Sequence, residues 1–106
     1  MINKIYYKGR FRINRGKLKE FNDLPDEIKE RFILIKKFID DFNMKDTDVY
    51  VTGSFYHGIW DEESDFDVLI TEKNNIDILR TKINDEINFK VHISYDENKI
   101  NNIIIK

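Results

Sequence analysis

Asp65 and Asp67 form the most informative pair in this sequence, because two carboxylates separated by one residue lead directly into the apolar run 68–70. Alternate side chains of a β-strand point to the same face, so both carboxylates should project together. Neighbouring carboxylates repel each other unless a cation lies between them, and their hard oxygens suit Mg²⁺ or Mn²⁺. The pair therefore predicts a divalent-metal site of the kind used in phosphoryl transfer.

Gly53 and Ser54 supply a second chemical feature, since they follow a short apolar stretch and open an expected helical turn at 54–58. A turn between a strand and a helix presents backbone N–H groups and a hydroxyl to phosphate oxygens. Glycine at 53 permits close approach of the backbone to a phosphate, and Gly58 lets the chain turn toward the acidic strand. The two features together predict phosphate binding beside a metal.

Three pieces form one pattern: a Gly-Ser turn after a strand, a second glycine, and an acid pair that opens another strand. The pattern resembles the signature of the polymerase-beta-like nucleotidyltransferase superfamily in its minimal form, over roughly residues 26–106. The resemblance implies nucleotide-binding roles for Gly53, Ser54 and Ser64, and catalytic and metal-binding roles for Asp65 and Asp67. The implied reaction is the transfer of a nucleotidyl group from a nucleoside triphosphate to a hydroxyl on a protein, an RNA or a small molecule.

His92 stands where the resembled family carries a third acidic residue, on a later strand beside the first pair. In that family the third acid binds metal and helps to deprotonate the attacking hydroxyl. Three interpretations stay open for His92, which we count among the catalytic candidates. It could be a general base, since imidazole titrates near neutral pH. It could be a nitrogen ligand, favouring Mn²⁺ or Zn²⁺ over Mg²⁺. It could mark a domain that has lost efficient catalysis and retains binding.

These residues require a scaffold, which the apolar spacing predicts. Pro25 followed by two acidic residues is typical of a helix start, and apolar residues recur at helical spacing through residue 42. Further elements are expected as strands at 48–52, 65–71 and 88–95 and as helices at 75–87 and 96–106. Helices and short strands in this order indicate an α+β fold with a small mixed sheet packed by helices.

Residues 1–20 form a basic arm with seven basic residues and one acidic residue; this local charge of +6 leaves −8 on the rest of a chain whose net charge is −2. Residues 5–13 alternate between apolar and polar side chains, which predicts a strand or hairpin with a bulge at Gly9. The expected apolar face carries Ile5, Tyr7, Phe11 and Ile13. We expect Arg10 and Arg12 to face solvent or a phosphate-bearing ligand such as nucleic acid. The other interpretation is that the arm packs on the acidic body.

The composition limits the class of protein. With 106 residues, the chain is expected to form a single domain, 1–106. It contains no cysteine, which excludes disulfide bridges and thiolate zinc sites. The longest apolar runs are too short to span a bilayer, and the basic N-terminus lacks a signal-peptide core. We therefore expect a cytoplasmic protein without membrane contact.

Three functions remain open at this level. The first is metal-dependent nucleotidyl transfer from a nucleoside triphosphate. The second is a catalytically weak protein of the same fold that binds a partner, as antitoxin-like members of the resembled family do. The third is a nucleic-acid-binding accessory protein that uses the basic arm, whose binding should weaken steeply with salt. The short chain offers no obvious second domain to hold an acceptor, which favours a protein partner or a homo-oligomer.

Overall fold

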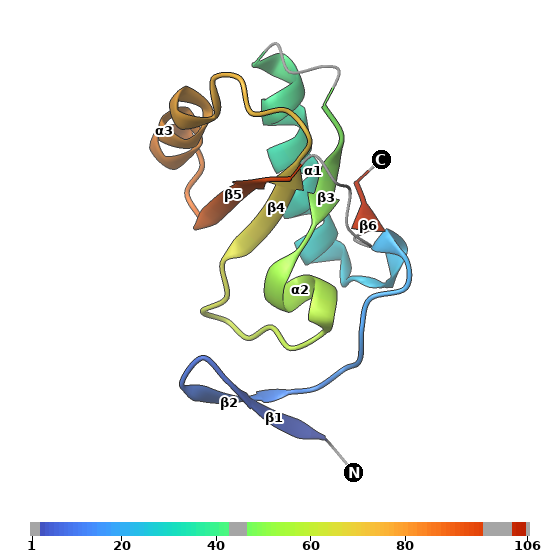
Figure 1. Cartoon of the computed structure of the whole chain (residues 1–106). Coiled ribbons are helices and arrows are strands. Elements are labelled where there is room, and N and C mark those ends of the chain that lie inside the picture. Colours follow the sequence, from blue (N-terminus) through green and yellow to red (C-terminus); the bar gives the residue numbers. More distant parts are fainter. Residues whose placement is uncertain (1–2, 43–46, 97–102, 106) are drawn as a thin grey trace.

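The computed structural model describes residues 3–42, 47–96 and 103–105 (Figure 1). Its strands are β1 (Lys4–Tyr7), β2 (Arg10–Ile13), β3 (Val49–Val51), β4 (Phe66–Ile70), β5 (Val91–Tyr95) and β6 (Ile103–Ile104). Its helices are α1 (Asp26–Asp41), α2 (Gly53–His57) and α3 (Ile76–Glu86), and a 3₁₀ turn covers Phe21–Asp23. Within these described ranges, no helix has the length and apolar character needed to cross a bilayer.

Four strands form a mixed sheet in the order β5-β4-β3-β6. β4 pairs with β5 in parallel, whereas β3 pairs antiparallel with both β4 and β6. Helix α3 supplies the crossover that a parallel pair requires between β4 and β5. The predicted α+β fold, with a small mixed sheet and an N-terminal hairpin, is confirmed. It places β4, the strand of the acid pair, between β3 and β5.

Helix α1 lies behind the sheet in Figure 1 and supplies much of the core. It begins directly after Pro25, as predicted, and its apolar side fully buries Phe32, Ile35 and Ile39. The Phe32 ring packs edge-on against Phe66 of β4, with 5.0 Å between ring centroids. Truncation of such a buried ring to alanine typically costs about 3–5 kcal/mol. This packing fixes the start of β4, where the acid pair lies.

The basic arm forms an antiparallel hairpin of β1 and β2, and one continuous strand over 5–13 is wrong. The chain reverses at Lys8 and Gly9, both of which have positive φ angles, 49° and 84°. The expected faces are also wrong: Phe11 is 73% exposed, whereas Arg12 is only 6% exposed. The physical reason is visible in Figure 1, where the hairpin lies beyond α2, away from the sheet and its core. Its inner side therefore meets a polar loop.

The C-terminal helix expected at 96–106 is wrong for the part that the structure describes. Residues 103–104 form β6, which pairs antiparallel with β3. Ile105 then buries its side chain, at 1% exposure, in the core cluster. The remaining residues of that predicted helix, 97–102 and 106, lie outside the described residues. An apolar end segment can satisfy an open strand edge, and this non-local pairing overrides helical spacing.

Candidate functional site

The acid pair lies at the start of β4 and faces a cavity of about 240 Å³. Asp65 immediately precedes the strand and Asp67 is its second residue, and both line the cavity together with Ser54. The structure thus brings together three of the residues expected to bind metal and phosphate. Burial raises the pKa of Asp67, and the nearby Asp65 carboxylate adds to this rise, while His92 and Lys8 oppose it. The two carboxylates therefore interact electrostatically.

The Gly-Ser turn lies directly against Asp67. Gly53 has a φ of 69°, and a Cβ added there would overlap the Asp67 carboxylate. The backbone N–H of Thr52 donates to the Asp67 carbonyl oxygen at 3.0 Å, which ties the turn to β4. Gly58 closes α2 in the left-handed conformation and so redirects the chain, as the sequence predicts. Glycine is needed at position 53 because the carboxylate occupies the space of a side chain.

His92 lies opposite Asp67 in the parallel register of β4 and β5. Its Nδ1 atom is 3.7 Å from Asp67 Oδ1, and its side chain is 65% exposed. Lys90, just before β5, places its Nζ atom 3.8 Å from Asp65 Oδ1. Each carboxylate therefore has a basic neighbour on the side of β5. No third carboxylate joins them: within the described part of the chain, no group of three or more histidine, cysteine or acidic residues is placed to hold a metal.

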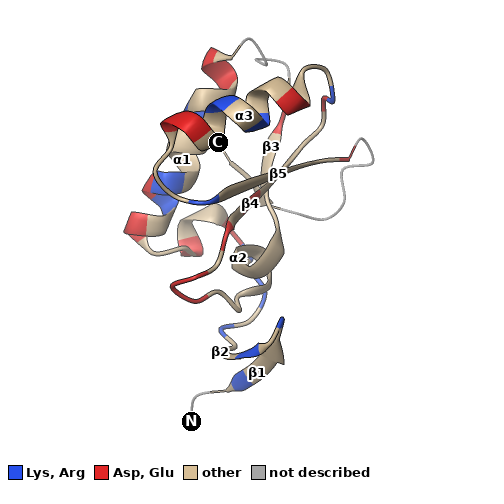
Figure 2. Cartoon of the chain, turned by 90° about the vertical axis from the view of Figure 1, so that its left-hand side faces the viewer, with Lys and Arg blue, Asp and Glu red and all other residues tan. Residues whose placement is uncertain are grey.

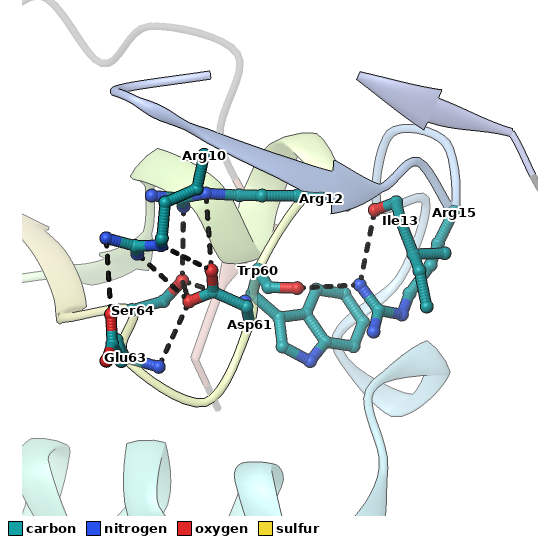
Figure 3. A network of polar contacts seen from close by, with 8 residues as sticks. All are labelled: Arg10, Arg12, Ile13, Arg15, Trp60, Asp61, Glu63 and Ser64. Atoms are coloured by element: carbon teal, nitrogen blue, oxygen red, sulfur yellow. Dashed lines mark hydrogen bonds and ion pairs between the residues drawn. The ribbon is translucent and has the colours of Figure 1, made fainter. Parts of the chain in front are cut away.

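The hairpin closes the other side of the same cavity with Lys8, Arg10 and Arg12. Arg10 makes a two-pronged ion pair with Asp61 of the loop between α2 and β4, at 2.8 and 3.1 Å (Figure 3). Arg12 Nε lies 3.5 Å from the same carboxylate. The expectation of a solvent-facing side chain is therefore wrong for Arg12, which is 5% exposed, whereas Arg10 keeps 40% of its side chain exposed while it contacts the acidic loop. The alternative that the arm packs on the acidic body describes their contacts.

Asp61 is the residue of this region that the sequence patterns did not single out. The hydrogen bond from Arg10 is the main cause that lowers its pKa to about 2. Figure 2 shows basic residues in blue on the hairpin and acidic residues in red on the neighbouring loop. The charge asymmetry between residues 1–20 and the rest of the chain carried that signal, although it does not identify the partner residues.

Ser64 connects the hairpin to the acid pair. Its hydroxyl accepts hydrogen bonds from the Asp61 backbone N–H at 2.9 Å and from Arg12 Nη1 at 3.3 Å, and it lies 3.2 Å from Asp61 Oδ1. Ser64 also lines the cavity. Ser64 therefore holds the loop in place through these hydrogen bonds, and it lies at the cavity where a ligand would bind.

A second contact joins the arm to the loop at Trp60. The Arg15 guanidinium lies 3.9 Å from the centroid of the Trp60 ring, and Phe55 stacks on that ring at 5.3 Å. The Arg15 side chain also donates to the Trp60 carbonyl oxygen at 2.9 Å. Backbone N–H groups of Arg15 and Leu18 donate to the carbonyl oxygens of Gly58 and Tyr56, both at 2.8 Å. The arm is thus fixed to the end of α2 as well as to the acidic loop.

Comparison with known proteins gives one informative match. A family model described as a nucleotidyltransferase domain matches residues 33–105. The matched region includes the Gly-Ser turn, the acid pair and His92, and it leaves out the hairpin. No curated protein and no solved structure gives a significant match.

Proposed function

Because the chain belongs to the nucleotidyltransferase domain family, we propose that it binds a nucleoside triphosphate and slowly transfers its nucleotidyl group to a hydroxyl acceptor, with pyrophosphate as the leaving group. The observation that carries this proposal is the convergence of Ser54, Asp65 and Asp67 on one cavity inside the matched region. The three residues supply a hydroxyl and two carboxylates, which are the groups that metal-bound phosphates require.

The donor set fits one divalent cation. Asp65 and Asp67 line one cavity, and the Asp65 carboxylate contributes to the raised pKa of Asp67. A shared cation would therefore relieve the repulsion between the two carboxylates. Mg²⁺ is commonly held by one or two carboxylates, with phosphates and water as further ligands. When bound, the cation would supply neutralisation of the charge that develops on the phosphoryl oxygens. A second cation fits poorly, because Lys90 and His92 flank the carboxylates where a third acid would stand.

The residues of the chain would share the remaining work. Ser54, which is 6% exposed and lines the cavity, would orient a phosphate group beside the acid pair. His92, with Nδ1 3.7 Å from Asp67 Oδ1, would occupy the place beside the acid pair where a third carboxylate would stand. With His92 and Lys90 on this side, the described residues offer no third carboxylate for a second cation, and this is why we propose slow transfer.

A specific observation supports partner binding as the second candidate. The outer side of the hairpin exposes Tyr6 (62%) and Phe11 (73%), whose rings contact each other edge-on at 5.0 Å. By the β1–β2 register, Ile13 lies on the same face and extends this apolar side at 41% exposure. Exposed apolar groups of this kind are typical of protein contacts. Binding of nucleic acid is less well supported, because the basic side chains of the hairpin line a cavity that also holds Asp65 and Asp67.

Incubation with each labelled nucleoside triphosphate, with Mg²⁺ or with Mn²⁺, tests the proposal. We expect label to enter a protein, RNA or small-molecule acceptor, and we expect Asp65→Asn and Asp67→Asn to abolish this transfer. The matched control is Asp77→Asn, because Asp77 is a highly exposed carboxylate on α3, away from the cavity. Transfer that survives both substitutions, or its absence with every nucleotide and acceptor, would contradict the proposal and favour partner binding.

A further inference from the structure

The hairpin lies outside the matched nucleotidyltransferase region, yet it forms one wall of the cavity that holds the acid pair. We propose that this hairpin is a phosphate-binding wall of the nucleotide site, in which Lys8 and Arg12 contact the polyphosphate chain of the substrate. The inference rests on the proposed function, and it assigns a ligand role to residues that the family match does not include.

Arg12 is the first reason. Its side chain is 5% exposed, and its Nε atom is buried without a hydrogen-bond acceptor. The nearest carboxylate oxygen, Asp61 Oδ2, lies at 3.5 Å, and the bond from Nη1 to Ser64 is long at 3.3 Å. Buried donors in proteins are nearly always satisfied, and charged ones cost most when they are not. A small turn of the guanidinium toward the cavity would exchange these weak contacts for a phosphate, which its planar fork matches.

Lys8 is the second reason. It occupies the hairpin turn with a φ of 49°, a conformation that costs a residue with a side chain about 1 kcal/mol or more. The two-residue loop between Tyr7 and Arg10 requires positive φ at both of its positions, so the chain reversal itself accounts for this conformation. It directs an exposed ammonium group to the cavity, close enough to the acid pair to influence Asp67.

The charges around the cavity support a compact polyanion that arrives with a cation. The lining carries four basic residues and three acidic ones: Lys8, Arg10, Arg12 and Lys90 against Glu63, Asp65 and Asp67. A divalent cation on the acid pair would leave a clear excess of positive charge for phosphate oxygens. The cavity of about 240 Å³ also has carboxylates in its floor, which would repel a nucleic-acid backbone that carries no such cation.

The wall is fixed in place before any ligand binds. The Arg10–Asp61 pair and the contacts of Arg15 tie the hairpin to the loop that runs from the Gly-Ser turn to the acid pair. One connected segment therefore positions the turn, the carboxylates and the cations. Groups held in this way bind a ligand with a smaller entropic cost than mobile side chains.

Calorimetric titration of the full chain with inorganic tripolyphosphate, with and without Mg²⁺, tests the inference. The diagnostic variant is Lys8→Asn, since asparagine tolerates positive φ and removes only the charge. We expect its affinity to fall about fivefold or more, in the range of a charge-assisted hydrogen bond at a partly exposed site. The matched control is Lys4→Asn, which removes the same charge from β1 outside this cavity. We expect it to stay within about twofold of the unaltered protein.

The outcomes separate this inference from the proposed function. Equal affinities for Lys8→Asn and the unaltered protein, or equal losses in Lys8→Asn and Lys4→Asn, would overturn the phosphate-binding wall. So would the absence of tripolyphosphate binding. In either of the two cases in which Lys8→Asn shows no specific loss of affinity, Asp67→Asn could still remove the Mg²⁺-dependent part of tripolyphosphate binding. That result would overturn the phosphate-binding wall and leave the proposed metal-dependent function supported. Binding that requires Lys8 and ignores both Mg²⁺ and Asp67 would instead support the wall and contradict metal-dependent transfer.

Discussion

Asp67 and His92 face each other across the parallel pair β4–β5, with 3.7 Å between Asp67 Oδ1 and His92 Nδ1. A basic group thus stands at the position where the family resemblance places a third carboxylate. The His92 side chain is 65% exposed, so the imidazole borders the carboxylate from the solvent side of β5. Two roles are open for the His92 side chain. It could occupy the place of a second divalent cation, or it could transfer a proton during the reaction.

The substitution His92→Asp distinguishes these two roles. We expect it to restore three carboxylates and to raise Mg²⁺-dependent nucleotidyl transfer about tenfold or more, because a second cation can then bind. Initial rates at several Mg²⁺ concentrations measure the change. The control His92→Asn removes the basic group without adding a carboxylate, and it should not produce this gain. Fast turnover by the unaltered protein that is lost in His92→Asp would show that the histidine itself is a working catalytic group.

The substitution Asp67→Asn should abolish Mg²⁺-dependent nucleotide binding and yet stabilise the protein. Burial raises the pKa of Asp67 above 3.8, so its ionised form costs folding free energy at neutral pH. The folded state holds its proton more tightly, and this cost therefore appears as the pH rises above 3.8 and is absent well below it. We expect the midpoint of thermal unfolding at pH 7 to rise by about 2–4 °C.

Thermal melts of Asp67→Asn at pH 7 and pH 3 test the sign of this effect. The gain in stability should be present at pH 7 and should shrink at pH 3. Glu62→Gln, which changes an exposed carboxylate in the neighbouring loop, is the control for the loss of one negative charge. A lower unfolding temperature of Asp67→Asn at pH 7 would contradict the prediction that the ionised Asp67 carboxylate lowers the stability of the folded protein.

The substitution Gly53→Ala should be far more damaging than Gly9→Ala. Both glycines have positive φ, but a Cβ at Gly53 would overlap Asp67, whereas a Cβ at Gly9 would meet nothing within 4 Å. We expect a loss in free energy of unfolding of about 2–4 kcal/mol for Gly53→Ala and about 1 kcal/mol for Gly9→Ala. Urea denaturation measures both, and similar losses would show that the turn and Asp67 are not in close contact.

The substitution Arg10→Gln should raise the pKa of Asp61 from about 2 toward 3.8. In the unaltered protein, this low pKa contributes stability above pH 3.8 that is lost as the pH falls through about 2. NMR titration of the Asp61 carboxyl carbon measures the shift, and we also expect faster trypsin cleavage of the released hairpin. Arg31→Gln is the control, because Arg31 pairs with Glu27. An unchanged Asp61 titration in Arg10→Gln would contradict the ion-pair anchor.

Local sequence patterns predicted the elements whose structure depends on local rules. Pro25 marked the start of α1, and the Gly-Ser turn marked α2 within one residue. The acid pair was placed at the start of a strand because apolar residues follow it, and β4 begins at Phe66. These features depend on backbone preferences and on periodic burial, which a single sequence records.

The errors concern contacts between distant parts of the chain. Arg12 was assigned to an exposed face because its neighbours alternate, but Asp61 and Ser64 bury it from 49 or more residues away. Residues 103–104 have helical spacing and nevertheless pair with β3 as a strand. The same holds for the candidate site. The hairpin wall of the cavity depends on a contact between distant residues, which the spacing of a sequence motif does not predict.

Trp60 gives the chain a built-in optical reporter. It is the one tryptophan of the sequence, and it is stacked between Phe55 and the Arg15 guanidinium. Indole emission shifts to longer wavelengths when water replaces such neighbours. Movement of the basic arm off the loop would therefore appear directly as a red shift in intrinsic fluorescence, without any label. The contact between the basic arm and the loop can then be followed in real time as salt, acid or a phosphate ligand is added.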